Sequence, residues 1–546
     1  MHPRNLISIC TAVAAVLVIA VIWSASLPGA AEPPVRFAVV TTSDMQSRLA
    51  PYANETGEFV GGISRISALV RQLRTDADGV LLVSTGNDMM GHFYHTFQGE
   101  PEMKATTAAG YDAACPGNHE FDFGSETYAN ALRYAGFPVV CANINPDNPT
   151  LASAIRPSVI LTEAGVRIGV FGLMTPDLAL LSAGGAEVSI NPDVAGVART
   201  MADSLRSGGA DLVIAVTQIG PASCREIAGQ VDGIDLIVDG DGSIRLYETV
   251  DGPRGWRTII VCGDMRGERL GLLEFTYSGG GIDDPVWTTV CLDGGIEGDP
   301  AIDALLQPYY RLYRASTDLE IGETGTPLDT RKSTVRTGEA AAGNLIADAW
   351  RDRFPDADVA FVNSGSIRTD TVYPAGPISS GMVAEILPFE DTVIRIRMTG
   401  KDILQALEMS ASALGPDHTG IGPGGFLQVS GLCVTIDMSN PPYAAAYEGG
   451  IVQEVQNPGS RVVNVSIERE GMFVPLDPDA EYVVLVNRWL AGGGDGYTIF
   501  ASQPEGNVSD TTVLDRDALS AYIQKHGTIA PVTEGRISII NAGQGY

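Results

Sequence analysis

The sequence turns polar at Gly117-Asn118-His119-Glu120-Phe121-Asp122, directly after a short, mostly apolar run from Tyr111 to Cys115. An asparagine amide oxygen can bind a metal ion, and an adjacent imidazole can donate a proton or a hydrogen bond to a phosphoryl oxygen. Asp122 can hold the His119 imidazole in one tautomer. The alternative is an ordinary polar turn, but the continuation into Phe123-Gly124 makes the pattern more specific. The stretch therefore predicts a metal-assisted phosphoester site.

The composition is that of a globular, strongly acidic protein. The chain has 546 residues, of which 45% are hydrophobic and 7% aromatic, and this length predicts two to four domains. The formal net charge is −31 and the isoelectric point is near 4.4. Nucleic-acid binding needs a basic surface, so we expect no nucleic-acid partner.

The N-terminus has the pattern of an export segment. His2 and Arg4 precede an apolar run from Leu6 to Trp23, which is followed by small and polar residues up to Ala31. The run is long for a cleaved signal and just long enough to span a bilayer. Residues 1–31 are therefore predicted to be either a signal peptide or a membrane anchor, and the rest of the chain is predicted to be extracytoplasmic.

Six cysteines follow the export segment, without the CxxC spacing of a zinc site. Cys115 and Cys141 each lie in or at the end of a strand-like run, so a disulfide between neighbouring strands is one interpretation. Buried free thiols are the other interpretation, and the preferred one for most of the six.

Strand-like and helix-like patterns alternate from Val35 to about Val290. The strand-like runs are Val35–Thr41, Val80–Ser84, Val139–Ala142, Val166–Gly172, Leu212–Thr217 and Leu236–Val238. The helical patterns include Ile63–Leu73, Glu126–Ala135 and Val194–Arg206. This alternation predicts a layered α/β domain over residues 35–298, with its chemistry where strands end. An amphipathic helix is predicted within residues 299–319, and a second domain over residues 320–541.

Several separate motifs occur in an order that resembles the 5′-nucleotidase family of exported metallophosphoesterases. In the first domain they are Ser43-Asp44-Met45-Gln46-Ser47, Gly117 to Gly124, Gly172-Leu173-Met174-Thr175-Pro176 and Ala215 to Gly220. In the second domain they are Gly343 to Ala349, Asn363 to Arg368, Leu387-Pro388-Phe389, Phe426 to Gly431 and Gly493 to Tyr497. The resemblance implies a four-layered α/β metallophosphoesterase sandwich, a linker helix and a second α/β nucleotide-recognition domain. It also implies hydrolysis of nucleoside 5′-phosphates by a metal-activated water.

The metal positions that the resemblance implies are changed in this chain. They fall on Asp44, Asn87, Asn118, Gln218 and Asp241. Asn87 stands where the family has a bridging aspartate, and Gln46 and Gln218 stand where it has histidines. Imidazole is the better ligand for zinc-like ions, whereas an oxygen-rich set suits Mg²⁺, Mn²⁺ or Ca²⁺ more weakly. His92 and His95 are interpreted as surface-loop residues rather than replacement ligands.

The positions that bind substrate in the family are better preserved. By resemblance, Phe426 and Trp489 flank the base, Arg336 and Arg368 clamp a phosphate, and Asn363 and Asp495 contact base and ribose. Stacking on two aromatic rings is worth about 1–3 kcal/mol per ring, and a guanidinium fork suits a phosphate. The competing interpretation of Phe426 and Trp489 is that they are core aromatics.

The sequence thus predicts an exported phosphohydrolase of nucleoside 5′-phosphates, secreted or anchored to the outer face of the membrane. His119 and Asp122 are the predicted catalytic residues, and divalent ions (Mg²⁺, Mn²⁺, Ca²⁺ or Zn²⁺) are the predicted cofactors. The expected partner is a nucleotide or a related phosphoester. The alternative is a non-catalytic nucleotide-binding protein that has lost its metals.

Overall fold

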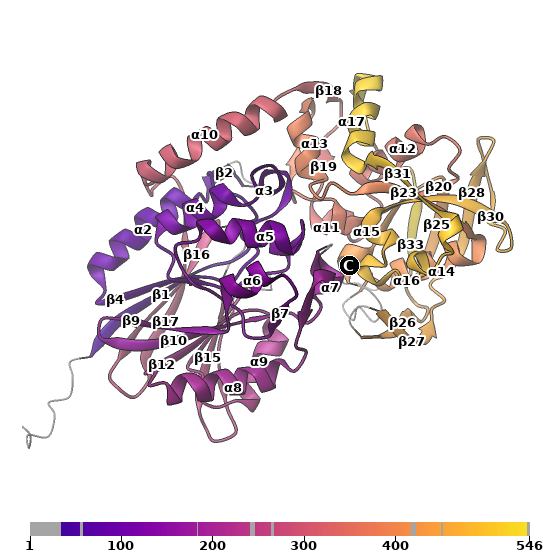
Figure 1. Cartoon of the computed structure of the whole chain (residues 1–546). Helices are drawn as coiled ribbons and strands as arrows, with labels where there is room; N and C mark the ends of the chain where they lie inside the picture. The colour runs from indigo at the N-terminus through magenta and orange to yellow at the C-terminus, as the bar shows by residue number, and fades with distance from the viewer. Residues whose placement is uncertain are drawn as a thin grey trace, which may run out of the picture.

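The computed structural model describes residues 34–54, 58–182, 184–240, 246–263, 267–415, 422–448 and 451–542. The predicted export segment, residues 1–31, and the candidate ligand Asp241 lie outside the described residues. Within the described part of the chain, no helix is both long and apolar enough to cross a membrane. The two domains lie side by side, joined by one long helix (Figure 1).

Two sheets form the centre of the first domain. In order across the first sheet, the described strands are β17 (Ile282–Cys291), β16 (Arg269–Tyr277), β1 (Val35–Thr42), β4 (Gly79–Ser84), β5 (Ala113–Ala114), β6 (Val139–Val140) and β8 (Ile155–Arg156). The second sheet has the order β14 (Leu246–Asp251), β15 (Arg257–Cys262), β13 (Leu236–Asp239), β12 (Leu212–Gln218), β10 (Val166–Met174) and β9 (Ser158–Glu163). The central strands of both sheets are parallel, and antiparallel strands lie at or near the edges.

Alternation along β1 shows how the layers form. Phe37 and Val39 face the second sheet and share a core with Val170 and Val216, whereas Ala38 and Val40 face helices. The helices on that outer face are α2 (Ile63–Asp76), α4 (Glu100–Ala109) and α10 (Pro300–Thr317). The helices α8 (Val194–Ser207) and α9 (Pro221–Gln230) cover the outer face of the second sheet. The layers are therefore helix, sheet, sheet and helix, which confirms the predicted four-layered sandwich.

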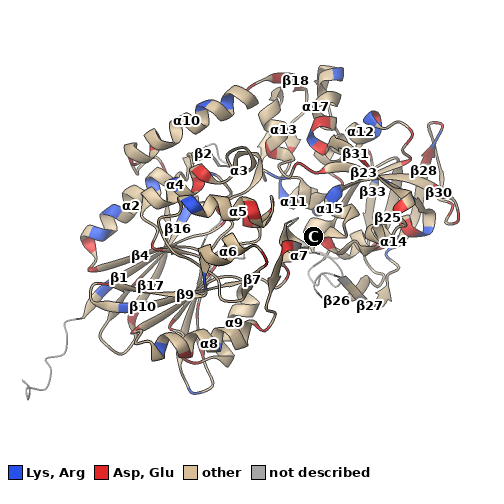
Figure 2. Ribbon diagram, in the orientation of Figure 1, with Lys and Arg blue, Asp and Glu red and all other residues tan. Residues whose placement is uncertain are grey.

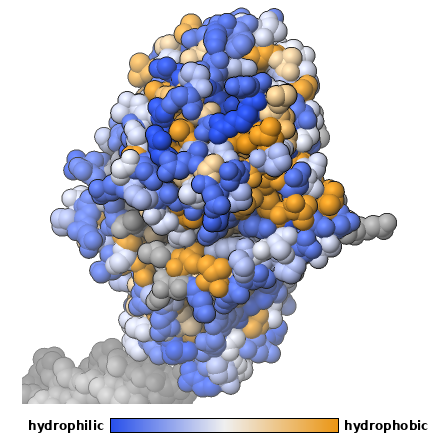
Figure 3. Space-filling view, turned by 90° about the vertical axis from the view of Figure 1, so that its right-hand side faces the viewer, coloured by the Kyte–Doolittle hydropathy of each residue, from blue (hydrophilic) through white to orange (hydrophobic). Residues whose placement is uncertain are grey.

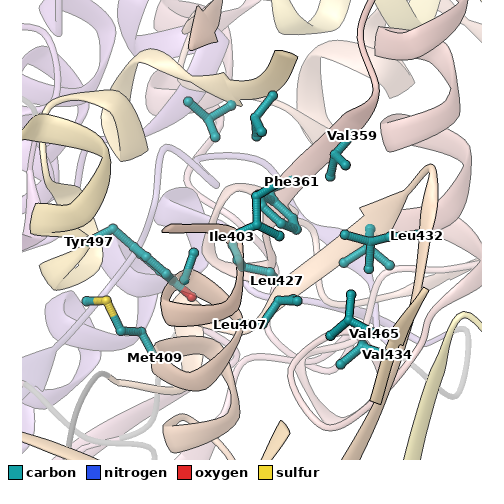
Figure 4. Packing of buried hydrophobic residues seen from close by; sticks show 14 of the residues in the cluster. Val359, Phe361, Ile403, Leu407, Met409, Leu427, Leu432, Val434, Val465 and Tyr497 are labelled. Atoms are coloured by element: carbon teal, nitrogen blue, oxygen red, sulfur yellow. The ribbon is translucent and has the colours of Figure 1, made fainter. Parts of the chain in front are cut away.

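A third large sheet forms the centre of the second domain. Its order is β24 (Leu427–Ser430), β20 (Val359–Asn363), β30 (Glu481–Asn487), β23 (Thr392–Thr399) and β31 (Val508–Leu514). Along β20, Ala360 and Val362 face a cluster that includes α12 (Ala341–Arg353), α13 (Ser380–Ile386) and α17 (Asp515–His526). Val359 and Phe361 face the opposite cluster, which includes α14 (Gly400–Ser412) and is drawn in Figure 4.

Smaller sheets and single turns complete the described chain. A four-stranded sheet contains β29 (Met472–Pro475), β28 (Val462–Arg469), β25 (Leu432–Asp437) and β33 (Ile537–Ile540), and a three-stranded sheet contains β22 (Gly376–Ser379), β18 (Glu320–Thr324) and β32 (Thr528–Ile529). Short helices include α3 (Gly91–Phe97), η1 (His119–Phe121), α5 (Ser125–Ala131), η2 (Leu132–Tyr134), α6 (Pro149–Ala154), α7 (Leu178–Leu181), α11 (Lys332–Val335), α15 (Arg488–Ala491), η6 (Gly494–Gly496) and α16 (Thr498–Ala501). The two-stranded pairs are β2 (Tyr52–Ala53) with β3 (Phe59–Val60), β7 (Ile144–Pro146) with β11 (Val188–Ile190), β19 (Leu328–Asp329) with β21 (Val372–Tyr373), and β26 (Tyr443–Glu448) with β27 (Ile451–Pro458).

The surface is mixed in charge and in hydropathy. Acidic and basic residues both occur on the helices of the two domains, separated by stretches of other residues (Figure 2). The face turned to the viewer in Figure 3 combines hydrophilic areas with separate hydrophobic patches. Within the described part of the chain, the cysteines form no disulfide, and Cys115 and Cys141 are buried thiols, as the preferred interpretation expected.

Candidate active site between the domains

The candidate site of the first domain lies where parallel strands end. The strands β1, β4 and β5 are neighbours, and their carboxyl ends carry Asp44, Asn87 and Asn118 in the loops that follow. The Ser43 hydroxyl donates to the carbonyl of Gly240 across 2.9 Å, which ties this edge to the end of β13 in the second sheet. The candidate residues therefore lie where strands end, which is where the sequence analysis expected the chemistry.

Asp44, Asn87 and Asn118 are in direct contact. The Asn87 side-chain amide donates from Nδ2 to Asp44 Oδ1 over 3.0 Å and to Asn118 Oδ1 over 3.2 Å. Its oxygen, Oδ1, accepts from the backbone N–H of His119 at 2.9 Å. A flipped amide would place two donors against each other at His119, so this backbone contact fixes which atom enters the site.

Glu120 supports this arrangement, a role that the sequence did not reveal. Its buried carboxylate accepts hydrogen bonds from the backbone N–H groups of Gly117, Asn87, Asp88 and Met89, at 2.6–3.2 Å. Burial raises the pKa of the Glu120 carboxyl, and these hydrogen bonds oppose the shift. Asn87 has a left-handed backbone at φ 55°, and three of the four bonds hold its loop in place.

The Asn87 amide lies between Asp44 and Asn118. In the family, by resemblance, a bridging carboxylate stands at this position, whereas here the amide places N–H donors there. These donors are directed at the Asp44 and Asn118 oxygens that the resemblance assigns to metal. The other Asp44 oxygen lies 2.5 Å from Ser43 Oγ, whose single proton is shared between this oxygen and the Gly240 carbonyl. Burial nevertheless raises the pKa of Asp44. The hydrogen bonds from Ser43 and Asn87 and the nearby His119 and Lys332 oppose this shift.

The two glutamines at the expected histidine positions behave differently. Gln218 is buried at the end of β12, and its Oε1 has no hydrogen-bond partner within the described residues. Gly240 lies against this oxygen, since a β-carbon at Gly240 would come within 2.3 Å of it. Gln46 instead lines a cavity between the domains. One unpaired neutral amide oxygen is a weaker ligand for a zinc-like ion than an imidazole.

His119 and Asp122 form the predicted pair. His119 Nδ1 lies 2.8 Å from Asp122 Oδ2, and the Ser182 hydroxyl donates to the other Asp122 oxygen over 3.1 Å. Both side chains are almost completely buried. A Nδ1–H donated to Asp122 leaves Nε2 as the ring nitrogen that can exchange a proton with a ligand.

In the second domain, Asn363 and Asp495 are also in contact. Asn363 donates from Nδ2 to Asp495 Oδ2 over 2.7 Å, and Asn487 donates to Asn363 Oδ1 over 3.1 Å. Desolvation raises the pKa of Asp495, opposed by hydrogen bonds from Asn363 and Trp489 and by the charges of Arg336 and Arg368. Asp495 has a left-handed backbone at φ 54°.

The two arginines lie close to this carboxylate. Desolvation lowers the pKa of Arg336, which remains a cation because Asp495 and Asp370 attract it. Within the described residues, Arg336 Nε has no hydrogen-bond partner. The Arg368 guanidinium carbon lies 4.9 Å from the centre of the Phe389 ring. These groups can attract an anion such as a phosphate.

The predicted aromatic sandwich is not open in this conformation. Phe426 has 0% exposed surface and belongs to the hydrophobic cluster that contains Phe361 and Tyr497. Trp489 is half-buried, and Gly494 packs against its indole, since a β-carbon at Gly494 would come within 2.3 Å of the ring. Phe426 therefore has the packing of a core residue, and its contact with a base stays a prediction that requires the adjacent turn to move.

The candidate residues of the first domain and those of the second form two half-sites, which meet across the domain interface. The His119 ring stacks on Phe389 with a centroid separation of 6.3 Å and an interplanar angle of 21°. Phe389 contacts Arg368 as well, so it connects the histidine of one domain to the arginine of the other. A cavity of about 780 Å³ lies beside this contact and is lined by Gln46 and Arg368 among others.

His92 and His95 are not surface-loop residues, contrary to the interpretation from sequence. They lie on α3, and their Nδ1 atoms are each 3.0 Å from Glu390 Oε1 in the second domain. The sequence offered no signal for this contact, because Glu390 is 298 residues from His92.

Comparisons with known proteins agree with this architecture. The family model for the C-terminal domain of 5′-nucleotidases matches residues 320–502. A snake venom 5′-nucleotidase of Gloydius brevicauda is 27% identical, over 96% of this chain and 92% of the relative, and a 5′-nucleotidase of Bos taurus is 28% identical, over 95% and 92%. The crystal structure of a 5′-nucleotidase precursor from Thermus thermophilus is similar with a TM-score of 0.81, 29% identity and coverage of 93% of this chain and all of that one. Residues 320–502 thus match the 5′-nucleotidase C-terminal domain, and the chain is similar to 5′-nucleotidases over nearly its whole length.

Proposed function

We propose that the chain is an exported phosphohydrolase that binds a nucleoside 5′-phosphate between its two domains and hydrolyses it slowly. The observation that carries this proposal is the stack of His119 on Phe389 beside Arg368. This stack places the buried His119 imidazole, which Asp122 orients, beside the Arg368 guanidinium, a cation suited to a phosphate. The names of the relatives, which are 5′-nucleotidases, support the substrate class.

The residues divide the chemistry between the domains. Arg336 and Arg368 attract the phosphate, and Asn363 and Asp495 supply polar groups for the nucleoside. A protonated His119 can donate from Nε2 to a phosphoryl oxygen or to the departing nucleoside oxygen, while Asp122 stabilises the imidazolium. General acid catalysis of this kind contributes about 10²–10⁴-fold to a rate.

Slow turnover follows from the metal positions. In two-metal phosphoesterases the ions activate water and neutralise the phosphoryl oxygens. Here the Asn87 amide donates to Asp44 and Asn118, so the described residues do not fit two ions, and we assign no step to them. A single, weakly held ion near Asp44, Asn118 and Gln218 is the most that these oxygens support, and Mg²⁺, Mn²⁺ or Ca²⁺ suits them better than Zn²⁺.

Export is part of the proposal because of the segment at residues 1–31. A short basic start, an apolar run and small residues are typical of secretion or anchoring. Relatives that are venom proteins support an extracellular location.

Phosphate release from AMP tests the proposal directly. We expect the full chain to release phosphate slowly, with some increase on adding Mn²⁺, and His119→Ala to lower the rate at least about 100-fold. His526→Ala is the matched control, because His526 lies on α17 beside Tyr522 and is expected to leave the rate unchanged. A real turnover rate that is identical in wild type and His119→Ala would refute the assigned role.

A non-catalytic nucleotide-binding protein is the second candidate, favoured by the position of the Asn87 amide. In that case AMP binds with no turnover, with or without Mn²⁺. Changing Gln46→His, Asn87→Asp and Gln218→His together is expected to raise the metal content strongly, because it restores two imidazoles and a carboxylate. Metal content that stays unchanged would show that the site has been redesigned rather than degraded.

A further inference from the structure

Three potential metal ligands, none of them among the expected metal positions, converge on the domain interface. His92 and His95 are three residues apart on α3, so their side chains lie on one face of the helix. Glu390 directly follows Phe389 and has a left-handed backbone at φ 57°. The ligand atoms of His92, His95 and Glu390 all lie within 4.8 Å of one another.

We propose that His92, His95 and Glu390 form a binding site for a divalent transition-metal ion such as Zn²⁺. Two imidazoles and one carboxylate are a ligand set that zinc accepts with one position left for water or substrate. Tetrahedral Zn–N and Zn–O bonds of about 2.0–2.2 Å place neighbouring ligand atoms about 3.3–3.6 Å apart. The observed separation of 3.0 Å between each Nδ1 and Glu390 Oε1 is slightly shorter, so the ligand atoms would move apart by a few tenths of an ångström to admit the ion.

The rings are already held in orientation by aromatic neighbours. The His95 ring lies 4.8 Å from the Phe123 ring, and the His92 ring lies 5.7 Å from the Tyr313 ring. The side chains of His92 and Glu390 are 18% and 15% exposed, and that of His95 is 40% exposed. An ion can therefore enter from solvent without unfolding of the interface. His92 also lines the cavity of about 780 Å³, from which a further ligand can come.

Arg516 competes with an ion for this position. Its Nη1 lies 2.7 Å from Glu390 Oε1 and 2.8 Å from His92 Nδ1. Arginine can only donate, so His92 Nδ1 must be the acceptor in this contact. An unprotonated Nδ1 then faces Glu390 Oε1 at 3.0 Å, and two acceptors are in contact.

A metal ion relieves that unfavourable contact. Once Arg516 turns away, the lone pairs of His92 Nδ1 and Glu390 Oε1 would both be directed at the cation. Asp517 offers the Arg516 guanidinium another partner, since it lies 4.0 Å from Arg516 Nε. The first two ligands belong to the first domain and the third to the second domain. The bound ion would therefore hold the domains together in this arrangement, next to the contact of Phe389 with His119.

Zn²⁺ binding to the chelator-treated full chain tests the site. Calorimetry and the absorption spectrum of bound Co²⁺ are recorded in an Asp44→Ala background, which removes the carboxylate of the other cleft. We expect one ion per chain in this background. His95→Ala and Glu390→Gln should each weaken Zn²⁺ binding at least about 100-fold, since even outer partners of metal ligands are worth 10–100-fold.

Arg516→Met removes the guanidinium that competes with the ion and leaves the three ligands unchanged. We expect it to strengthen Zn²⁺ binding about 10-fold, because it removes one hydrogen-bonded charge from the position of the ion. Hydrogen exchange of the backbone amides of residues 387–391 should slow when Zn²⁺ is added to the wild type. His95→Asn serves as a milder variant if His95→Ala misfolds, and Glu126→Gln, at an exposed residue of α5, is the control.

The proposal is overturned if the Asp44→Ala chain binds no Zn²⁺. It is also overturned if binding survives both His95→Ala and Glu390→Gln, or if Arg516→Met binds Zn²⁺ no more tightly than its parent.

Discussion

Glu102 is a buried carboxyl whose titration should be visible in the stability of the protein. It is 1% exposed, and its Oε1 accepts from the Ser47 hydroxyl over 2.7 Å, while its Oε2 has no hydrogen-bond partner within the described residues. Burial raises its pKa from 4.5 to about 7. Ser47 also accepts from the backbone N–H of Met90 over 3.0 Å, so Glu102 supports the loop that carries Asp44.

The sign of the effect follows from the direction of this shift. Between pH 4.5 and about 7 the folded protein binds more protons at Glu102 than the unfolded chain does, so the free energy of unfolding falls as the pH rises. A pKa difference of this size lowers the free energy of unfolding by about 3 kcal/mol, and this loss is complete above about pH 7. Below pH 4.5 the carboxyl is neutral in both states and the contribution is constant.

Glu102→Gln removes this titration and keeps an oxygen for Ser47. We expect the free energy of unfolding of the variant, minus that of the wild type, to rise by up to about 3 kcal/mol from pH 4.5 to pH 8. Urea unfolding over this pH range measures the difference, and any pH-independent cost of the new amide cancels from the slope. Glu274→Gln, at an exposed position of β16, controls for loss of charge. Equal slopes for Glu102→Gln and wild type would refute the reasoning.

Three further changes test the two half-sites. Asp122→Asn is expected to lower AMP turnover at least about 100-fold with little change in AMP affinity, because His119 loses the carboxylate that orients it; an unchanged rate would contradict this. Arg336→Met should weaken AMP binding about 10- to 100-fold in calorimetry and leave adenosine binding unchanged; equal losses for both ligands would mean that the arginine does not bind phosphate. Gly494→Ala should destabilise the protein by about 1–3 kcal/mol in thermal unfolding, because its β-carbon would collide with the Trp489 indole; an unaltered unfolding midpoint would show that the indole moves freely.

The fold was largely predictable because its elements follow local patterns. The run Val166–Gly172 became the strand Val166–Met174, and the helical pattern Val194–Arg206 became the helix Val194–Ser207. Apolar periodicity sets these elements, and their buried faces need no knowledge of distant residues. The motif from Gly343 to Ala349 likewise lies within one helix, Ala341–Arg353.

The site was less predictable because its chemistry depends on contacts between distant residues. The residue type at Asn87 indicated a lost charge, but the direction of its amide depends on the backbone of His119 and on Glu120. The contact of His92 with Glu390 joins two domains and has no local signal. Phe426 matched a substrate-binding position by resemblance, yet its burial depends on the packing of the whole second domain.

We propose that the Asn87 amide takes the place of a bridging carboxylate. Titration of the full chain with Mn²⁺, an ion that prefers oxygen ligands, tests this proposal when wild type and Asn87→Asp are compared by electron paramagnetic resonance. We expect weak binding to the wild type and binding at least about 10-fold tighter to Asn87→Asp, since a carboxylate replaces two N–H donors that face Asp44 and Asn118. Wild type that binds two Mn²⁺ ions in the cleft as tightly as the variant would contradict it.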